Sequence, residues 1–143
     1  MINVLENPIF VVAEKLRQIE IEISQLRGAF NLFALIERED SLGNWDLVNS
    51  ADWIGNNQKQ LIDMIAFRIS TKLDNNEKLM LSRILILPSN DKFVQSLNLI
   101  GVEHGSARIT NCTFNGILVR EALLITSKQS QKKAEKANER QKK

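Results

Sequence analysis

The chain has 143 residues, of which 43% are hydrophobic and 25% charged, with six Gly, two Pro and one Cys. These proportions are ordinary for a globular protein and too apolar for a wholly disordered one. The lone Cys112 excludes an internal disulfide and a cysteine-built zinc site. No run of about 18 apolar residues is present, and the first residues do not resemble a secretory signal, so we expect a cytoplasmic protein.

The net charge of +2 is spread unevenly along the chain. Residues 128–143 contain seven Lys or Arg and two Glu, which gives +5, so residues 1–127 carry −3. We expect a single α+β domain over 1–127 and a basic tail over 128–143 that is helical or disordered, because the tail has no apolar face. The tail either solubilises the protein or binds nucleic acid or an acidic protein. The candidate nucleic-acid-binding residues are Lys132, Lys133, Lys136 and Arg140.

Apolar residues near the amino terminus recur every three or four positions, which predicts a helix over residues 8–27. Asn7 is its expected cap and Gly28 its expected stop. The apolar seam of this helix consists of Ile9, Val12, Leu16, Ile19, Ile23, Leu26 and Phe30.

This seam can be buried in two ways. It can cover the protein's own sheet, or it can join the same helix of a second copy in a parallel coiled coil. In the coiled coil, Lys15 would face Glu20 and Glu22 would face Arg27, and both pairs attract. The candidate interface residues are Val12, Leu16, Ile19, Ile23 and Leu26.

The middle of the chain alternates between strand and helix patterns. Residues 30–36 are almost continuously apolar, which predicts a strand buried on both faces, and residues 45–51 can return as its hairpin partner. Helical spacing between 56 and 73 predicts a second helix, and residues 77–82 can add a short helical piece.

A second buried strand is predicted over residues 84–87, immediately before Pro88. Ser89 or Asn90 is the expected cap of a short helix. The apolar residues of that helix are Phe93, Val94 and Leu97.

Asn115-Gly116 lies between two β-rich segments, 107–114 and 117–126. This dipeptide predicts a type I′ hairpin, because both central positions of that turn need positive φ. The turn fixes the register, with Phe114 opposite Ile117, Cys112 opposite Val119 and Thr110 opposite Glu121. The element order α-β-β-α-β-α-β-β then predicts an α+β fold, with a mixed five-stranded sheet, packed helices and a basic C-terminal extension.

Acidic residues gather around the first predicted hairpin. Carboxylates on neighbouring strands can bind Mg²⁺, so a metal-dependent hydrolase built on Glu37, Glu39 and Asp46 is one hypothesis. The interleaved Arg38 disfavours it, and Glu39 stands where comparable nuclease motifs have lysine.

His104 is the only histidine and lies in a predicted loop between two glycines. In an extended segment His104 and Cys112 would be about 26 Å apart, which is too far for a nucleophile pair. We therefore interpret His104 as non-catalytic and Cys112 as a core residue. Trp45 and Trp53 are interpreted as core anchors.

The sequence carries no phosphate-binding loop, calcium loop or metalloprotease motif. We therefore assign no catalytic residue, metal site or cofactor. The leading hypothesis is a non-enzymatic protein-interaction or assembly module that forms a homo-oligomer, such as a homodimer, or a subunit of a complex. The alternatives are a non-specific nucleic-acid-associated protein that uses the basic tail, and the metal-dependent hydrolase.

Overall fold

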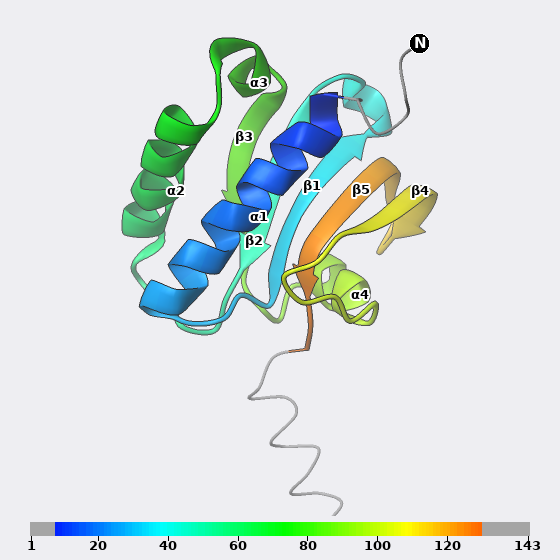
Figure 1. The fold of residues 1–143 in the computed structure, drawn as a ribbon. Helices are drawn as coiled ribbons and strands as arrows, with labels where there is room; N and C mark the ends of the chain where they lie inside the picture. The colour runs from blue at the N-terminus through cyan, green and yellow to red at the C-terminus, as the bar shows by residue number, and fades with distance from the viewer. Residues whose placement is uncertain (1–7, 130–143) are drawn as a thin grey trace, which may run out of the picture.

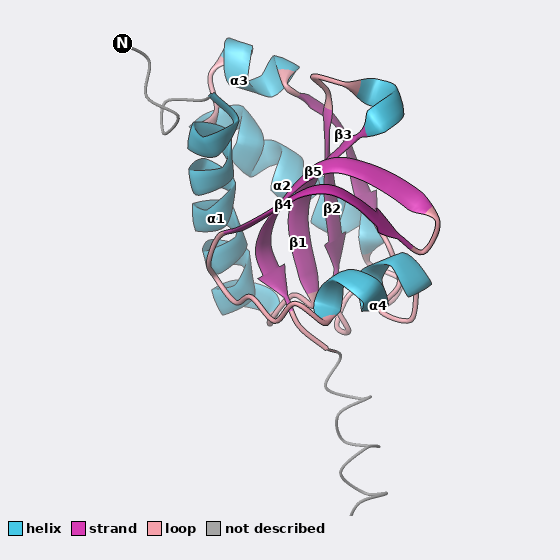
Figure 2. Cartoon of the chain, turned by 90° about the vertical axis from the view of Figure 1, so that its right-hand side faces the viewer, coloured by secondary structure: helices cyan, strands magenta, loops and turns pink. Residues whose placement is uncertain are grey.

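A computed structural model describes residues 8–129 as a five-stranded sheet with helices on both faces (Figures 1 and 2). The expected α+β fold and element order are confirmed, except that the second helical region is divided into two helices. In chain order the elements are α1 (Pro8–Arg27), β1 (Leu32–Arg38), the 3-10 helix η2 (Glu39–Ser41), β2 (Trp45–Ser50), α2 (Gln58–Lys72), α3 (Asn75–Leu79), β3 (Leu81–Ile86), α4 (Lys92–Asn98), β4 (Ala107–Phe114) and β5 (Ile117–Ser127).

The strands are arranged in the order β3-β2-β1-β5-β4. β1 pairs antiparallel with β2 and β5, β4 pairs antiparallel with β5, and β3 runs parallel to β2. The central β1 is buried along almost its whole length, which confirms the burial on both faces that its continuous apolar run predicts. β3 and β4 form the two edges.

Each face of the sheet has its own apolar core. α1 and α2 cover one face, and α4 covers the other (Figure 2). The larger core includes Leu16, Ile19, Phe33, Leu47, Ile65 and Ile125. The smaller core includes Leu32, Val48, Val94, Leu97, Val119 and Leu124.

α1 ends at Arg27 because Gly28 takes a φ of +128° that L side chains rarely adopt. Its N–H donates to the carbonyl of Ser24 at 2.9 Å, and a Cβ at this position would lie 2.9 Å from Cδ1 of Trp53. The predicted stop is confirmed. The predicted cap, Asn7, lies outside the described residues.

The β4–β5 hairpin has the turn and the register that its sequence predicts. Asn115 and Gly116 have φ values of 49° and 80°, as the type I′ prediction requires. All three predicted cross-strand pairs are present: Thr110 with Glu121, Cys112 with Val119 and Phe114 with Ile117.

Two predictions around β3 were wrong. The strand begins at Leu81, three residues earlier than expected, because α3 begins early, after its N-cap Asp74, and has already ended at Leu79. Asp74 accepts from the Glu77 N–H at 2.8 Å, and Glu77 accepts from the Asp74 N–H, which forms a capping box. β3 is also an edge strand whose apolar side chains are only partly buried, whereas its sequence predicted burial on both faces.

The cap of α4 also differs from the expectation. Asp91, rather than Ser89 or Asn90, accepts from the N–H groups of Phe93 and Val94 at 2.8 and 3.2 Å. A carboxylate is favoured at the N-cap because it accepts hydrogen bonds from the free N–H groups of the first turn and lies at the positive end of the helix dipole.

No helix within residues 8–129 combines the length and the apolarity needed to span a membrane.

Candidate interaction surface

The predicted coiled-coil residues lie mostly inside the molecule. Val12, Leu16, Ile19 and Ile23 are fully buried in the larger core, where α1 covers the protein's own sheet. Leu26, which is 65% exposed, is the one member of that set available to a partner in this arrangement. Association therefore has to be sought on another surface.

The open side of β3 is such a surface. Leu87, just beyond the strand, donates its N–H to the carbonyl of Asn49 in β2 at 3.0 Å. The backbone groups of Ile84 and Ile86 alternate with it and therefore face away from β2. Because β3 is the last strand of the sheet, these groups form an edge that another strand can extend.

A groove of about 430 Å³ runs beside this edge, between α2 and β3. Its apolar lining comes from both elements, and Lys78 and Arg83 add positive charge. Phe67, on α2 next to the lining residue Ala66, is 68% exposed. The apolar lining residues are Ile62, Ala66, Ile69, Leu81 and Ile84.

The charge of Arg83 is already partly compensated. Its Nε lies 3.1 Å from Oδ1 of Asp46, and a second guanidinium nitrogen donates to Oδ2 of Asp46 at 3.2 Å. Hydrogen bonding to this carboxylate raises the pKa of Arg83 above its ordinary value. β3 therefore presents apolar side chains with little uncompensated charge between them.

The acidic residues of the hydrolase hypothesis do not converge. Asp46 pairs with Ile36 across β1 and β2, so Asp46 lies on the Ile36 face of the sheet, whereas Glu37 points to the opposite face. Glu39 lies in η2 and is exposed. Within residues 8–129, no group of three or more His, Cys, Asp or Glu side chains is placed to hold a metal ion.

The carboxylates of Asp46 and Glu37 are instead in contact with arginine side chains and a backbone N–H. Asp46 is 5% exposed and also lies 3.5 Å from Nε of Arg38. Glu37 accepts from the N–H of Gly43 at 2.8 Å and lies 3.7 Å from Nε of Arg120. Both carboxylates therefore have structural partners, and the hydrolase hypothesis gains no support from this geometry.

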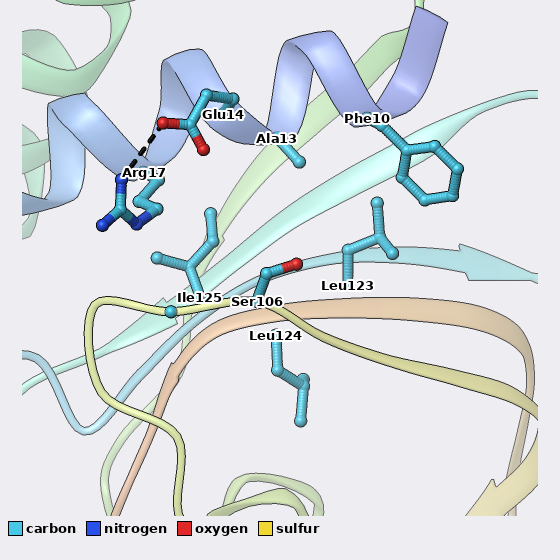
Figure 3. A pocket seen from close by; sticks show the side chains of 9 residues that line it. Phe10, Ala13, Glu14, Arg17, Ser106, Leu123, Leu124 and Ile125 are labelled. Atoms are coloured by element: carbon cyan, nitrogen blue, oxygen red, sulfur yellow. Dashed lines mark hydrogen bonds and ion pairs between the residues drawn. The ribbon is translucent and has the colours of Figure 1, made fainter. Parts of the chain in front are cut away.

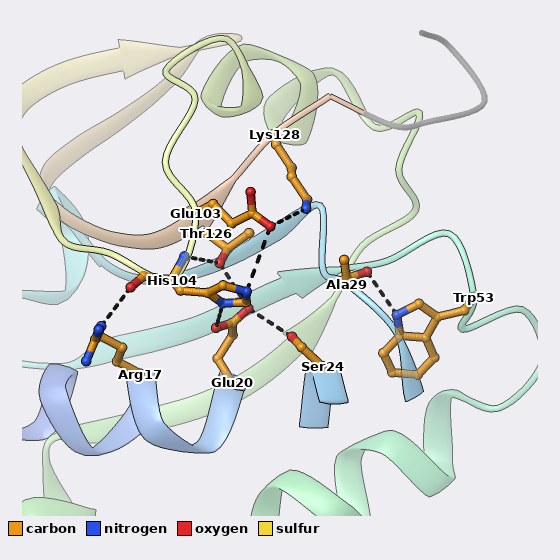
Figure 4. A network of polar contacts seen from close by, with 9 residues as sticks. All are labelled: Arg17, Glu20, Ser24, Ala29, Trp53, Glu103, His104, Thr126 and Lys128. Carbon is orange, nitrogen blue, oxygen red and sulfur yellow. Dashed lines mark hydrogen bonds and ion pairs between the residues drawn. The ribbon is translucent and has the colours of Figure 1, made fainter. Parts of the chain in front are cut away.

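A buried polar network joins α1 to the loop before β4 (Figure 4). Glu20 is fully buried, and its carboxylate receives hydrogen bonds from the hydroxyls of Ser24 and Thr126, both at 3.0 Å. Its second oxygen lies 2.7 Å from Nδ1 of His104. His104 has a φ of 49°, and the guanidinium of Arg17 donates to its carbonyl at 2.8 Å.

This network has the carboxylate–histidine part of a catalytic triad but lacks a nucleophile. Among the described residues, no hydroxyl or thiol is hydrogen-bonded to Nε2 of His104, which faces Glu103 at 3.8 Å. Cys112 donates instead to the carbonyl of Thr110. The network satisfies a buried carboxylate and fixes a loop. Glu20 and His104 are 84 residues apart in the chain, so no local pattern in the sequence predicts their contact.

A smaller pocket of about 280 Å³ opens on the other side of this loop (Figure 3). Its walls are mainly apolar, from Phe10 and Ala13 of α1 and from β5. At its rim, Arg17 is paired with Glu14 at 3.1 Å and is also hydrogen-bonded to the loop. The polar groups here mainly contact one another.

The remaining predicted residues, Lys132, Lys133, Lys136 and Arg140, lie outside the described residues. Comparison of the chain with protein-family models, curated proteins and solved structures finds no match. The functional interpretation therefore depends on the chemistry of the surfaces described above.

Proposed function

We propose that the protein is an assembly module that pairs with a second copy of itself through the open edge of β3. The observation that supports this most directly is the mismatch between the sequence of β3 and its position. Ile84, Leu85 and Ile86 form the run expected of a covered strand, yet they lie half-buried at the end of the sheet. Pairing with another strand would remove this mismatch.

A second copy is the occupant that fits this edge, because an antiparallel pair of identical strands related by a two-fold axis is self-complementary. With the axis at Ile84, Ile84 faces its own counterpart and Ser82 faces Ile86 of the other copy. Arg83 then faces Leu85. An axis at Arg83 would instead oppose two guanidinium groups, which is destabilising.

The groove completes the interface. A stable interface buries roughly 800 Å² per partner, which is more than one six-residue strand offers. The apolar groove beside β3 and the exposed Phe67 on α2 extend the contact surface. The two five-stranded sheets would then form one continuous sheet through the dimer.

The test is the molar mass of the full chain by light scattering after size exclusion, over a wide range of concentrations. Ser82→Lys and Thr110→Lys form a matched pair, because both replace exposed hydroxyl residues on edge strands with a charged residue. We expect a dimer that Ser82→Lys weakens at least about tenfold and that Thr110→Lys leaves unchanged. A monomer at every concentration, or equal behaviour of the two variants, would overturn the proposal.

A further inference from the structure

The proposed β3 seam, the line along which two copies of β3 would pair, has an open apolar side. Leu81, Ile84 and Ile86 of β3 pack against the larger core, on the face that α1 and α2 cover. They remain half-buried beside the groove of about 430 Å³ that separates β3 from α2. The two-fold axis of an antiparallel strand pair is perpendicular to the sheet, so α2 of the second copy lies on this same face. The second α2 is therefore the element placed to close the groove.

α2 and β3 run in opposite directions along the groove (Figure 1). The groove is lined from Ile62 to Ser70 on α2 and from Leu81 to Ile84 on β3. These two stretches have similar lengths, about 12 Å along the helix and about 10 Å along the strand. Ile62 therefore lies level with Ile84, where the proposed two-fold axis crosses the seam.

Small residues line the α2 side of the groove. Ala66 and Ser70 are both exposed there, so a second helix can approach closely. Packed helices lie roughly 8–10 Å apart and paired strands about 4.8 Å apart, so helices beside two adjacent β3 strands can be in contact. Lys59 and Asp63 are exposed on this side as well, since they precede the groove-lining residues Ile62 and Ala66 by three positions.

The charges on the two sides of α2 differ in their partners. On the α1 side, Arg68 and Lys72 bind Glu22 at 2.7 and 2.6 Å. On the groove side, neither Lys59 nor Asp63 forms an ion pair with any residue in the range 8–129. In an antiparallel pair of α2 helices centred near residue 62, Lys59 of each copy lies beside Asp63 of the other, so both charges gain a partner.

We propose that α2 packs antiparallel against α2 of the second copy over the β3 seam, with Lys59 of each copy paired to Asp63 of the other. This inference rests on the proposed pairing through β3. Exposed ion pairs add little affinity, but they select the register and orientation in which two surfaces meet. The α2 contact therefore determines which alignment of the two β3 strands is adopted, and apolar burial in the groove supplies the affinity.

The experiment reverses these charges and measures the dimer dissociation constant of the full chain by light scattering at a series of concentrations. Lys59→Asp and Asp63→Lys each place like charges beside each other at two symmetric points, so each should weaken the dimer about tenfold. The double variant Lys59→Asp, Asp63→Lys forms both pairs again with opposite polarity and should return to within about threefold of the wild type. Thermal unfolding of each variant checks that the fold is intact.

Lys92→Asp is the matched control. Lys59 and Lys92 are exposed lysines in the first turns of α2 and α4, and α4 covers the opposite face of the sheet. The control therefore makes the same change in net charge and at a helix N-terminus, and it should leave the dimer unchanged. Salt provides a second measurement, because screening should loosen the wild-type dimer and tighten the dimers of the two single variants relative to this control.

The outcomes separate the α2 contact from the β3 pairing. Single variants that behave like Lys92→Asp, or a double variant no tighter than the single ones, would overturn the α2 contact. If Ser82→Lys still weakens the dimer in that case, the pairing through β3 stands without it. A chain that is monomeric at every concentration would overturn both proposals.

Discussion

The two edges of the sheet are built very differently. β4 alternates along its length, and its exposed side chains are polar, among them Arg108, which pairs with Glu121 at 2.5 Å. Midway along β4, Asn111 has a φ of 51° and has no partner in the β5 register. Polar side chains and a local irregularity are the features by which natural sheets prevent edge-to-edge pairing.

β3 has neither protection over its second half. From Ile84 to Ile86 it carries three successive apolar side chains, and its single charge, on Arg83, is partly compensated by Asp46. Its register with β2 is irregular only at its first residues, beside Trp45. β4 therefore has the features that prevent edge pairing, whereas β3 lacks them over its second half, and this difference supports the proposed pairing through β3.

The largest effect should come from placing a charge at the centre of each edge. Ile84→Lys and Ile109→Lys replace two half-buried isoleucines with the same residue. In the β3-paired dimer, two copies of the new lysine would lie opposite each other, so we expect Ile84→Lys to weaken dimerisation more than about a hundredfold. Ile109→Lys should destabilise the fold to a similar degree and still dimerise. Light scattering and thermal unfolding measure the two effects separately, and a dimeric Ile84→Lys would contradict the distinction between the edges.

The second prediction concerns the turn that holds β4. Gly116 has a φ of 80°, so Gly116→Val places a β-branched residue where it is strongly disfavoured. Nothing lies within 4 Å of a Cβ built there, so the cost is conformational rather than a clash. We expect a loss of about 1–3 kcal/mol in the free energy of unfolding, measured with urea, and an unchanged dimer. Unchanged stability would show that the turn does not fix this edge.

Most of the fold could be predicted because its signals are local. The spacing of apolar residues over 8–27 locates α1, and Asn115-Gly116 sets the β4–β5 register residue by residue. The sequence of β1 is continuously apolar, as is typical of a strand with both faces covered, because β1 lies at the centre of the sheet.

The candidate sites could not be predicted in the same way. Strand order decides whether an apolar run lies at the centre or at an edge, and nothing within the sequence of β3 records that order. For the same reason Asp46 and Glu37 were expected to lie close together, although the register places them on opposite faces. The Glu20–His104 contact also depends on segments far apart in the chain.

A third prediction tests how the β3 side is supported. Glu77 completes the capping box of α3 and binds Lys15 of α1 at 2.7 Å. The hydrogen bond from Lys15 is the largest cause that lowers the pKa of Glu77 below its ordinary 4.5. A lowered pKa stabilises the fold above about pH 4.5, and this contribution is lost as the pH falls through the folded-state value. We expect Glu77→Gln to cost about 1 kcal/mol near neutral pH and to flatten the acid loss of stability.

Urea unfolding near pH 7 and near pH 3 measures both effects of Glu77→Gln. Glu14→Gln is the matched control, because Glu14 is an exposed glutamate of α1 that pairs with Arg17 on the same helix. An equal acid response in the wild type and in Glu77→Gln would show that this carboxylate does not support the β3 side.

The smallest effect is expected at the irregularity of β4. Asn and Gly both tolerate the left-handed conformation found at Asn111, so Asn111→Gly should change the free energy of unfolding by less than about 0.5 kcal/mol and leave the molar mass unchanged. Asn111→Ala should cost about 1 kcal/mol, because alanine is disfavoured at positive φ. Thermal unfolding compares the two variants. If Asn111→Ala instead raised the molar mass, β4 would have lost its irregularity and paired with the edge of another molecule. That result would show that Asn111 keeps the β4 edge from pairing.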